Sequence, residues 1–189
     1  QYASAPGHFG PVRLRYLRWM MPGSVRRAAV VTTPSQYVRG CVIDVLGADE
    51  DSVVVVPHGV PEPEPRPGPE QIAAARAAHA IGEPPYVIYP AITHPHKAHH
   101  VLVDMLAHLD PDTLLVLPGG EGAAEPALRE AITSTGAGGR VRRVGRIGRV
   151  ELDALVAGAE ALVFPSEYEG FGAPLVEAMT LGTPIVCSA

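Results

Sequence analysis

The sequence predicts an α/β protein whose core is a parallel β-sheet. Short apolar runs alternate along the chain with helical patterns, at a spacing typical of βα units. Several of these runs are rich in Val, Leu and Ile without interruption, as in strands that are buried on both faces. Apolar residues make up 47% of the 189 residues and charged residues only 19%, so the chain can build a core and is not expected to be disordered.

The first part of the chain, residues 1–60, contains two predicted strands joined by a helix. The strands are 28–33 and 52–56, and the second is a valine run of the buried parallel type. The helix begins at Pro34-Ser35 and ends at Gly47. Its expected apolar face consists of Val38, Cys41, Val42, Val45 and Leu46. Five prolines then fall within residues 61–69, which predicts an extended linker and a domain boundary.

The second part, residues 70–189, alternates strands with helices and predicts a domain with a parallel sheet. The expected strands are 86–89, 113–117, 141–144, 161–164 and 184–187. The expected helices are 70–80, 97–109, 125–135, 150–159 and 174–181. The chain does not start with Met, and its last strand has no helix after it to cover it, so we expect a fragment with a truncated second domain.

Charge is unevenly distributed along the chain. Residues 1–43 contain six arginines and no acid, whereas the remainder carries nine basic and twenty acidic residues. The arginines are Arg13, Arg15, Arg18, Arg26, Arg27 and Arg39. A basic segment with apolar neighbours can contact an anionic membrane surface, and the alternative is an ordinary helix with a solvated arginine face.

Other classes are disfavoured by composition. No apolar run approaches the roughly 18–20 residues that span a bilayer, and we expect no signal peptide, because no charged segment followed by an apolar segment comes after Gln1. The two cysteines, Cys41 and Cys187, are too few for a disulfide scaffold, which favours a cytoplasmic location. Aromatic residues are 5% of the chain, which argues against a base-stacking nucleic-acid platform.

The loop after strand 161–164 carries the richest chemistry. Gly170 and Gly172 permit close approach of backbone to a ligand and precede a helix whose unpaired N–H groups suit a phosphate. Glu169 and Glu177 flank this cradle and are suited to hydrogen-bond sugar hydroxyls. The alternative is that Glu177 is simply an acid favoured by the helix dipole and that Glu169 is a solvated loop residue.

Lys97 is the only lysine among fifteen basic residues. It opens the predicted helix 97–109, where a cation would provide a second grip on phosphate, unless it is an ordinary surface lysine. The histidines His94, His96, His99 and His100 surround it in sequence. His96, His100 and Asp104 have the spacing of metal ligands on one helical face, but a histidine beside a phosphate is the simpler role.

Residues 165–186 read Pro-Ser-x-x-Glu-Gly-Phe-Gly-x-Pro-x-x-Glu-Ala-Met-x-x-Gly-x-Pro-Ile-Val. This pattern resembles the E-x7-E signature of the retaining glycosyltransferases of family 4, which have the GT-B fold. Val-Pro-His-Gly-Val at 56–60, the Val-Gly-Arg-Ile stretch at 144–147 and Pro-His-Lys-Ala-His at 95–99 are similar to further segments of that family. The resemblance extends over nearly the whole chain from about residue 24.

The resemblance implies two Rossmann-like domains of a GT-B protein. Residues 1–60 would be the end of the N-terminal, acceptor-side domain, and 70–189 the incomplete domain that binds the nucleotide-sugar donor. It implies transfer of a sugar, with retention, from a nucleoside-diphosphate sugar to a glycan or glycolipid, in polysaccharide or glycolipid assembly. No metal, other cofactor or nucleic acid is implied, and the fragment alone would be inactive because most of the acceptor-side domain is missing.

The family roles can be carried over by position. Glu169 would contact the donor sugar, Glu177 the nucleotide ribose, and Lys97 the diphosphate. The remaining donor contacts would be Gly170, Phe171, Gly172 and Ala173 near the sugar and phosphate, and Arg146 and Ile147 near the base. Many members have an arginine after the first strand of this domain, where this chain has Pro90-Ala91, so we expect His96 to donate to the diphosphate instead.

Two other classes of function stay open at this point. The first is a GT-B relative that does not transfer sugar, either a sugar-nucleotide epimerase or a nucleotide-sugar-binding module, although the E-x7-E spacing argues against the epimerase. The second is a structural or nucleic-acid-binding protein that uses the basic N-terminal segment.

Overall fold

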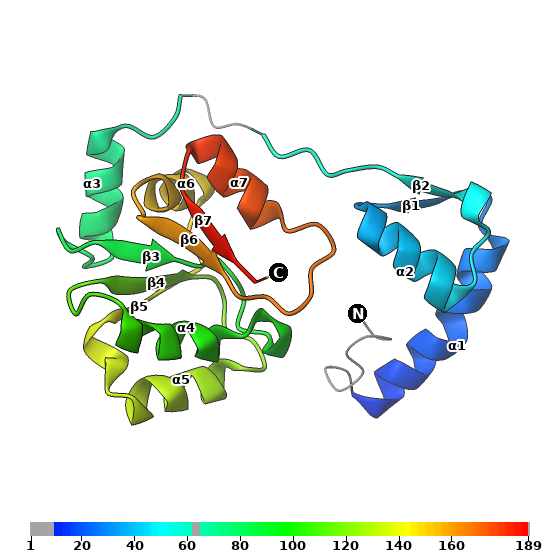
Figure 1. Ribbon diagram of the computed structural model, residues 1–189, viewed down its shortest axis with the longest axis horizontal. Coiled ribbons are helices and arrows are strands. Elements are labelled where there is room, and N and C mark those ends of the chain that lie inside the picture. The colour runs from blue at the N-terminus through cyan, green and yellow to red at the C-terminus, as the bar shows by residue number, and fades with distance from the viewer. Residues whose placement is uncertain (1–9, 62–64, 189) are drawn as a thin grey trace. The chain divides into compact units, whose positions relative to one another are not determined.

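The computed structural model describes residues 10–61 and 65–188 (Figure 1). The chain divides into two compact units. The first unit contains the described residues up to Gly59 together with Tyr168–Gly172, and the second contains the described residues of Val60–Glu167 and those from Ala173 on. Residues 62–64 of the predicted linker and residues 1–9 of the basic segment lie outside the described part. Within that part, no helix is both long enough and apolar enough to cross a bilayer.

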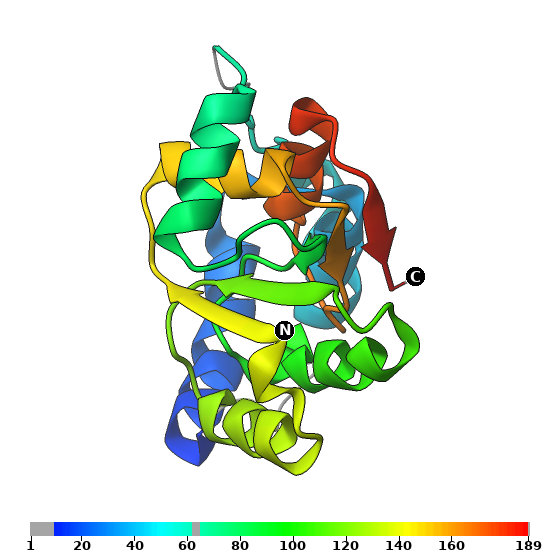
Figure 2. The same cartoon turned by 90° about the vertical axis from the view of Figure 1, so that its left-hand side faces the viewer.

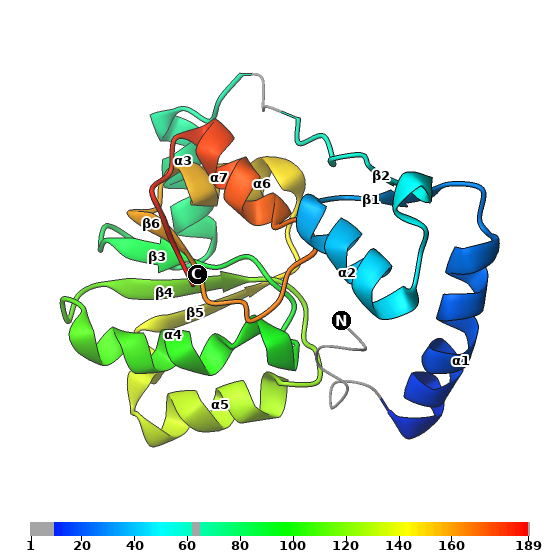
Figure 3. The same cartoon turned by 45° about the vertical axis from the view of Figure 1, so that its right-hand side comes forward.

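The first unit pairs two short parallel strands with two helices (Figure 3). Its elements are α1 (Pro11–Arg27), β1 (Val31–Thr33), α2 (Gln36–Leu46), a 3₁₀ turn (Glu50–Ser52) and β2 (Val53–Val55). Ser35 caps α2 by accepting a hydrogen bond from the Val38 N–H at 3.2 Å, and Gly47 ends the helix with φ +68°. The small core consists of Val25, Leu46, Ala48 and Val53.

Two expectations for this unit are wrong. Val45 was expected on the apolar face of α2 but is 52% exposed, whereas Val42 and Ile43 pack against the core. The valine run of β2 was expected to be buried on both faces, but Val54 is 47% exposed. Side chains alternate across a strand, and the described elements cover the face of Val53 while they leave the face of Val54 open.

The second unit is a five-stranded parallel sheet with the strand order β5-β4-β3-β6-β7. The strands are β3 (Tyr86–Ile88), β4 (Leu114–Pro118), β5 (Val141–Gly145), β6 (Ala161–Phe164) and β7 (Ile185–Cys187). The helices are α3 (Pro69–Ala78), α4 (His99–Met105), α5 (Glu125–Ser134), α6 (Arg149–Ala157) and α7 (Ala173–Leu181). Helices α4 and α5 cover one face, and α3, α6 and α7 cover the other (Figures 1 and 2).

The expected α/β class with a parallel sheet is confirmed, and its central strands are buried on both faces as predicted. Every residue of β3 and β4 is buried. Helix α7 has Pro174 in its first turn and ends at Gly182 with φ +78°, as the sequence indicated.

The strand order reverses direction between β3 and β6. From β3 the chain proceeds through β4 to β5, and it then crosses back to β6 and β7 on the other side of β3. The loops that follow β3 and β6 therefore diverge to opposite faces of the sheet. In open α/β sheets a ligand binds beyond the carboxyl ends of the strands at such a switch point.

The predicted continuous helix 97–109 is wrong. The segment consists of a 3₁₀ turn at Pro95–Lys97, the seven-residue helix α4, and a second 3₁₀ turn at Leu106–His108. Ala98 interrupts the helix because its backbone is left-handed, with φ +48°. Lys97 therefore lies in a tight turn two residues before α4 and does not open a helix.

Candidate functional site

Four loops at the carboxyl edge of the second unit are joined to their neighbours by backbone hydrogen bonds. They follow β5, β4, β3 and β6, in the order in which these strands lie in the sheet. The bonds run from Ala91 N to Pro118 O (2.9 Å), from Gly119 N to Gly145 O (2.7 Å) and from Glu167 N to His96 O (2.9 Å). Backbone hydrogen bonds thus hold these four loops, and the predicted site residues on them, in position relative to one another.

A pocket of about 390 Å³ opens between the loops after β3, β4 and β5. Arg146 and Ile147, the two residues expected near a base, form part of its wall. The other lining residues are Pro90, Ala91, Ile92, Pro118, Gly119, Gly120, Gly145 and Leu152. Gly119 is required here because its φ is +133° and a Cβ would stand 2.1 Å from the Ala91 carbonyl oxygen.

Lys97 and His96 lie between the ends of β3 and β6. Lys97 is half-buried, and its Nζ is 5.6 Å from the centre of the Phe164 ring. The His96 ring stacks on the His94 ring with centroids 5.9 Å apart. Among the described residues, no group of three or more His, Cys, Asp or Glu side chains is placed to hold a metal ion, so the structure does not bring His96, His100 and Asp104 together as ligands.

His99 is buried, with 3% of its surface exposed. Its ring packs against the Tyr89 ring at 5.1 Å, and neither ring nitrogen makes a hydrogen bond of normal geometry, although the Ala91 backbone lies near. Burial is the largest cause that lowers the pKa of His99, to about 4, and the Arg143 and Lys97 cations lower it further against the opposing Glu125 carboxylate. The imidazole beside Lys97 is therefore neutral.

A buried carboxylate holds the loop after β3 in place. Glu125 is 4% exposed and accepts hydrogen bonds from the Thr93 hydroxyl at 2.9 Å and from Arg143 Nη2 at 2.8 Å. The Thr93 hydroxyl in turn accepts from the Gly122 N–H at 2.7 Å. This network could not be predicted from the sequence, because its members come from three segments that are far apart in the chain.

Glu177 is held by an arginine from the neighbouring helix. Arg149 Nη1 donates to Glu177 Oε1, and Arg149 Nε lies 2.8 Å from Asp153 Oδ1. Partial burial tends to lower the pKa of Arg149, but its hydrogen bonds and charge interactions with the two carboxylates outweigh that effect and raise it. The spacing of Arg149 and Asp153 by four residues was visible in the sequence, whereas the bond to Glu177 was not.

The first unit holds the segment that contains Glu169. Ser35 Oγ donates to the Gly170 carbonyl oxygen at 2.7 Å, and the Phe171 ring meets the His58 ring edge-on at 5.3 Å. Of the predicted site residues, the first unit thus contains Glu169, Gly170, Phe171 and Gly172, and the second contains His96, Lys97, Arg146, Ile147, Ala173 and Glu177.

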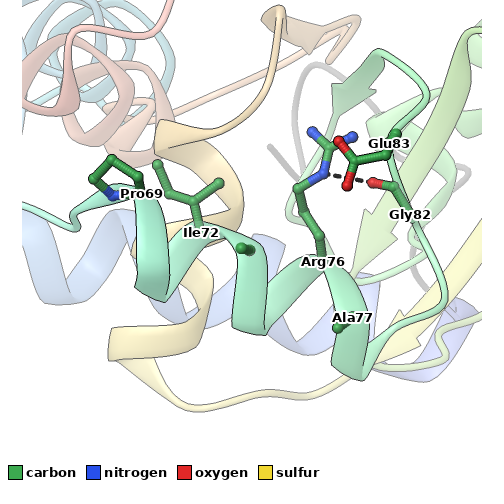
Figure 4. A pocket seen from close by; sticks show the side chains of 7 residues that line it. Pro69, Ile72, Arg76, Ala77, Gly82 and Glu83 are labelled. Carbon is green, nitrogen blue, oxygen red and sulfur yellow. Dashed lines mark hydrogen bonds between the residues drawn. The ribbon is translucent and has the colours of Figure 1, made fainter.

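Another pocket lies beside α3 and the loop that precedes β3, and so at the amino edge of the sheet (Figure 4). Its only basic residue, Arg76, donates to the Gly82 and Pro84 carbonyl oxygens, both at 2.7 Å, and lies over the Tyr86 ring. Arg76 is thus occupied in fixing the loop, and Glu83 is the pocket's other charged residue. We assign this pocket no chemistry.

The second unit matches a known family. The model of the family described as Glycosyl transferases group 1 matches residues 71–189. The chain is 26% identical over 189 residues to O-antigen chain mannosyltransferase B of Escherichia coli, covering 98% of this chain and 50% of that protein. It is 33% identical over 156 residues to D-inositol 3-phosphate glycosyltransferase of Nocardia farcinica, covering 78% of this chain and 34% of that protein.

Solved structures agree on the fold. The crystal structure of Anabaena Alr3699/HepE in complex with UDP and glucose superposes with a TM-score of 0.83 at 26% identity, covering 96% of this chain and 49% of that one. The structure of WaaG, a glycosyltransferase involved in lipopolysaccharide biosynthesis, gives a TM-score of 0.83 at 17% identity, covering all of this chain and 54% of that one. The chain thus spans about half the length of these proteins.

Proposed function

Because the chain belongs to the Glycosyl transferases group 1 family, we propose that the protein containing it transfers a sugar from a nucleoside-diphosphate sugar to a glycan or glycolipid acceptor. We include in the proposal the finer assignment to retaining transferases of family 4 with an E-x7-E signature. The proposal of sugar transfer rests on one observation. In the region matched by the family, Lys97 and a pocket lie at the carboxyl edge of the sheet, beside the switch point between β3 and β6. The names of the relatives and the UDP complex of a similar structure support it.

In this proposal the second unit binds the nucleotide. Lys97 binds the diphosphate and stabilises the negative charge that grows on it as the sugar departs. The neutral His99 beside it adds no competing positive charge. Glu177 accepts hydrogen bonds from the ribose, and the pocket wall at Arg146 and Ile147 faces the base.

The sugar end of the donor would meet the segment after β6. Glu169 contacts the sugar, and the backbone from Gly170 to Ala173 donates to the sugar and phosphate oxygens. His96 replaces the second cation that many relatives have at the position of Ala91. The proposal includes no metal and no cofactor besides the donor.

The test is a binding screen that follows thermal unfolding of the protein with UDP, GDP, ADP and their glucose and mannose conjugates. A ligand at one hundred times its dissociation constant should stabilise the folded protein by about 2.7 kcal/mol. The stabilisation should persist when EDTA is added. If none of these ligands shifts the transition at millimolar concentration, the proposal is wrong.

Turnover separates a transferase from a relative that only binds nucleotide sugars or epimerises them. Incubation with the donor found in the screen should transfer sugar to a glycan or lipid acceptor. Analysis of the product's anomeric configuration should give the configuration of the donor. Inversion would contradict the assignment to the retaining family, and donor binding without transfer to any acceptor would favour the binding module.

A second proposal concerns α1 and a peripheral contact with an anionic membrane on the cytoplasmic side. Val12, Tyr16 and Trp19 follow one another at helical spacing on one face and are 83%, 57% and 77% exposed. Exposed arginines, among them Arg15 and Arg26, lie beside this face. Apolar residues flanked by arginines suit the interface of an acidic bilayer.

Vesicles test this contact directly. Trp19 is the only tryptophan, so its fluorescence reports α1 without interference. Its emission should shift to the blue with vesicles that contain phosphatidylglycerol, and less so at high salt. An unchanged spectrum with acidic vesicles would leave α1 an ordinary helix with a solvated arginine face.

A further inference from the structure

Arg149 lies where two parts of the proposed nucleotide site meet. It is the first residue of α6 and directly follows the loop of Gly145–Gly148, whose Arg146 and Ile147 line the pocket. Its guanidinium reaches across to α7, where Nη1 donates to Glu177 Oε1. One side chain therefore connects the base-side loop with the carboxylate proposed to bind the ribose.

The guanidinium is itself anchored. Its Nε lies 2.8 Å from Oδ1 and 3.0 Å from Oδ2 of Asp153, a residue one turn further along α6 that is 6% exposed. The side chains of Arg149 and Glu177 are 44% and 21% exposed. A planar guanidinium fixed on one side by a buried carboxylate can present its remaining N–H groups in one direction only.

The hydrogen bond from Arg149 leaves Glu177 able to accept further hydrogen bonds from hydroxyl groups. An ionised carboxylate has about four acceptor sites, and the arginine uses one on Oε1, so acceptor capacity remains for ribose hydroxyls. The position of Glu177 is restricted as well, since the partner that holds it belongs to another helix.

We propose that Arg149 is a positioning residue for the nucleotide, which orients Glu177 toward the ribose hydroxyls. The inference rests on the proposed function, in which Glu177 binds the ribose. It assigns no role in the transfer step to Arg149 itself. It also makes ribose recognition depend on a residue that adjoins the base-side loop.

The experiment compares nucleotides with and without the ribose hydroxyls. Calorimetry measures binding of UDP, GDP and ADP, and of their dideoxyribose counterparts, to the wild type and to Arg149→Gln, Glu177→Gln and the double variant. Arg149→Gln should weaken binding of the preferred ribonucleotide about tenfold and change binding of its dideoxy counterpart less than about twofold. The double variant should bind no more weakly than Glu177→Gln alone, because both changes remove the same interaction.

Arg129→Gln is the matched control. Arg129 also joins two carboxylates, those of Glu121 and Glu125, but it does not contact Glu177. It should leave the preference for the ribonucleotide unchanged. Should Arg149→Gln fail to fold, Arg149→Lys keeps the charge without the planar fork and should reduce the same preference by a smaller factor.

Two results have separate meanings. If the Arg149 variant loses affinity equally for both sugar forms, or for neither, Arg149 does not act through the ribose and the inference is wrong. If the wild type binds none of the six nucleotides, the proposed function itself fails.

Discussion

Acid should destabilise the second unit through the buried ring of His99. Its pKa is about 4 in the folded chain against 6.5 for the free side chain, so between these values the unfolded chain binds a proton that the folded chain excludes. The sign follows from this difference: the stabilising contribution is complete above pH 6.5 and is lost as the pH falls toward 4. At about 1.36 kcal/mol per pKa unit, the full loss is about 3 kcal/mol, of which about 2 kcal/mol is gone by pH 5.

Urea unfolding followed by far-ultraviolet circular dichroism measures this loss from pH 8 to pH 4.5. Other groups titrate in this range, so the decisive quantity is the difference between the wild type and His99→Phe. Phenylalanine keeps a ring against Tyr89 and removes the nitrogen that must be protonated.

His99→Phe should weaken the pH dependence by about 2 kcal/mol between pH 8 and pH 5. His108→Phe, a change at an exposed imidazole, is the control and should retain the wild-type dependence. Parallel curves for the wild type and His99→Phe would refute the reasoning. They would mean that the buried ring accepts a proton in place or does not titrate in this range.

Three further predictions concern the loops and the donor. In a urea denaturation assay, Gly119→Ala should lower the free energy of unfolding by roughly 2 kcal/mol or more, because the new Cβ would stand 2.1 Å from a carbonyl oxygen. Gly136→Ala is the control in the same assay. Gly136 has φ +69° but no atom within 4 Å of the new Cβ, so this change should cost only about 1 kcal/mol. Lys97→Ala should weaken nucleoside-diphosphate binding by about 1.5–3 kcal/mol in calorimetry, and unchanged affinity would exclude a phosphate contact. Glu169→Gln should mainly lower kcat and Glu177→Gln mainly weaken nucleotide binding; equal changes in KM alone would contradict this division of roles.

The sequence predicted the parts of the fold that depend on local pattern. The strands at Leu114–Pro118 and Ala161–Phe164 are unbroken apolar runs, and Pro174 and Gly182 mark the ends of α7. Predictions of burial and helix continuity were wrong where a neighbouring element or a single backbone angle determines the local structure. Ala98 breaks a regular helical pattern by adopting a left-handed conformation that its side chain does not signal.

For the candidate site, the sequence indicated which strand-end loops carry the candidate residues, because each loop follows a recognisable apolar run. The structure places Arg146 and Ile147 in the wall of one pocket, and the loop that bears Lys97 is bonded to the loop after β6 through His96 O and Glu167 N. The supporting contacts were not predictable. Arg149 and Glu177 are separated by 28 residues, and nothing in the spacing of the chain connects them before α6 and α7 pack together.

The backbone hydrogen bonds between the loops of the second unit bear on how its ligand preference could change in evolution. They join main-chain atoms, which every residue except proline supplies in full, so they place little demand on side-chain identity. Arg146 can thus be exchanged with little effect on the geometry of the loops beside it. Gly119 cannot be exchanged in the same way, because a Cβ at this position would collide with the Ala91 carbonyl oxygen. If the pocket binds the base as proposed, single substitutions in its wall can change the base preference while the backbone bonds between the loops are kept.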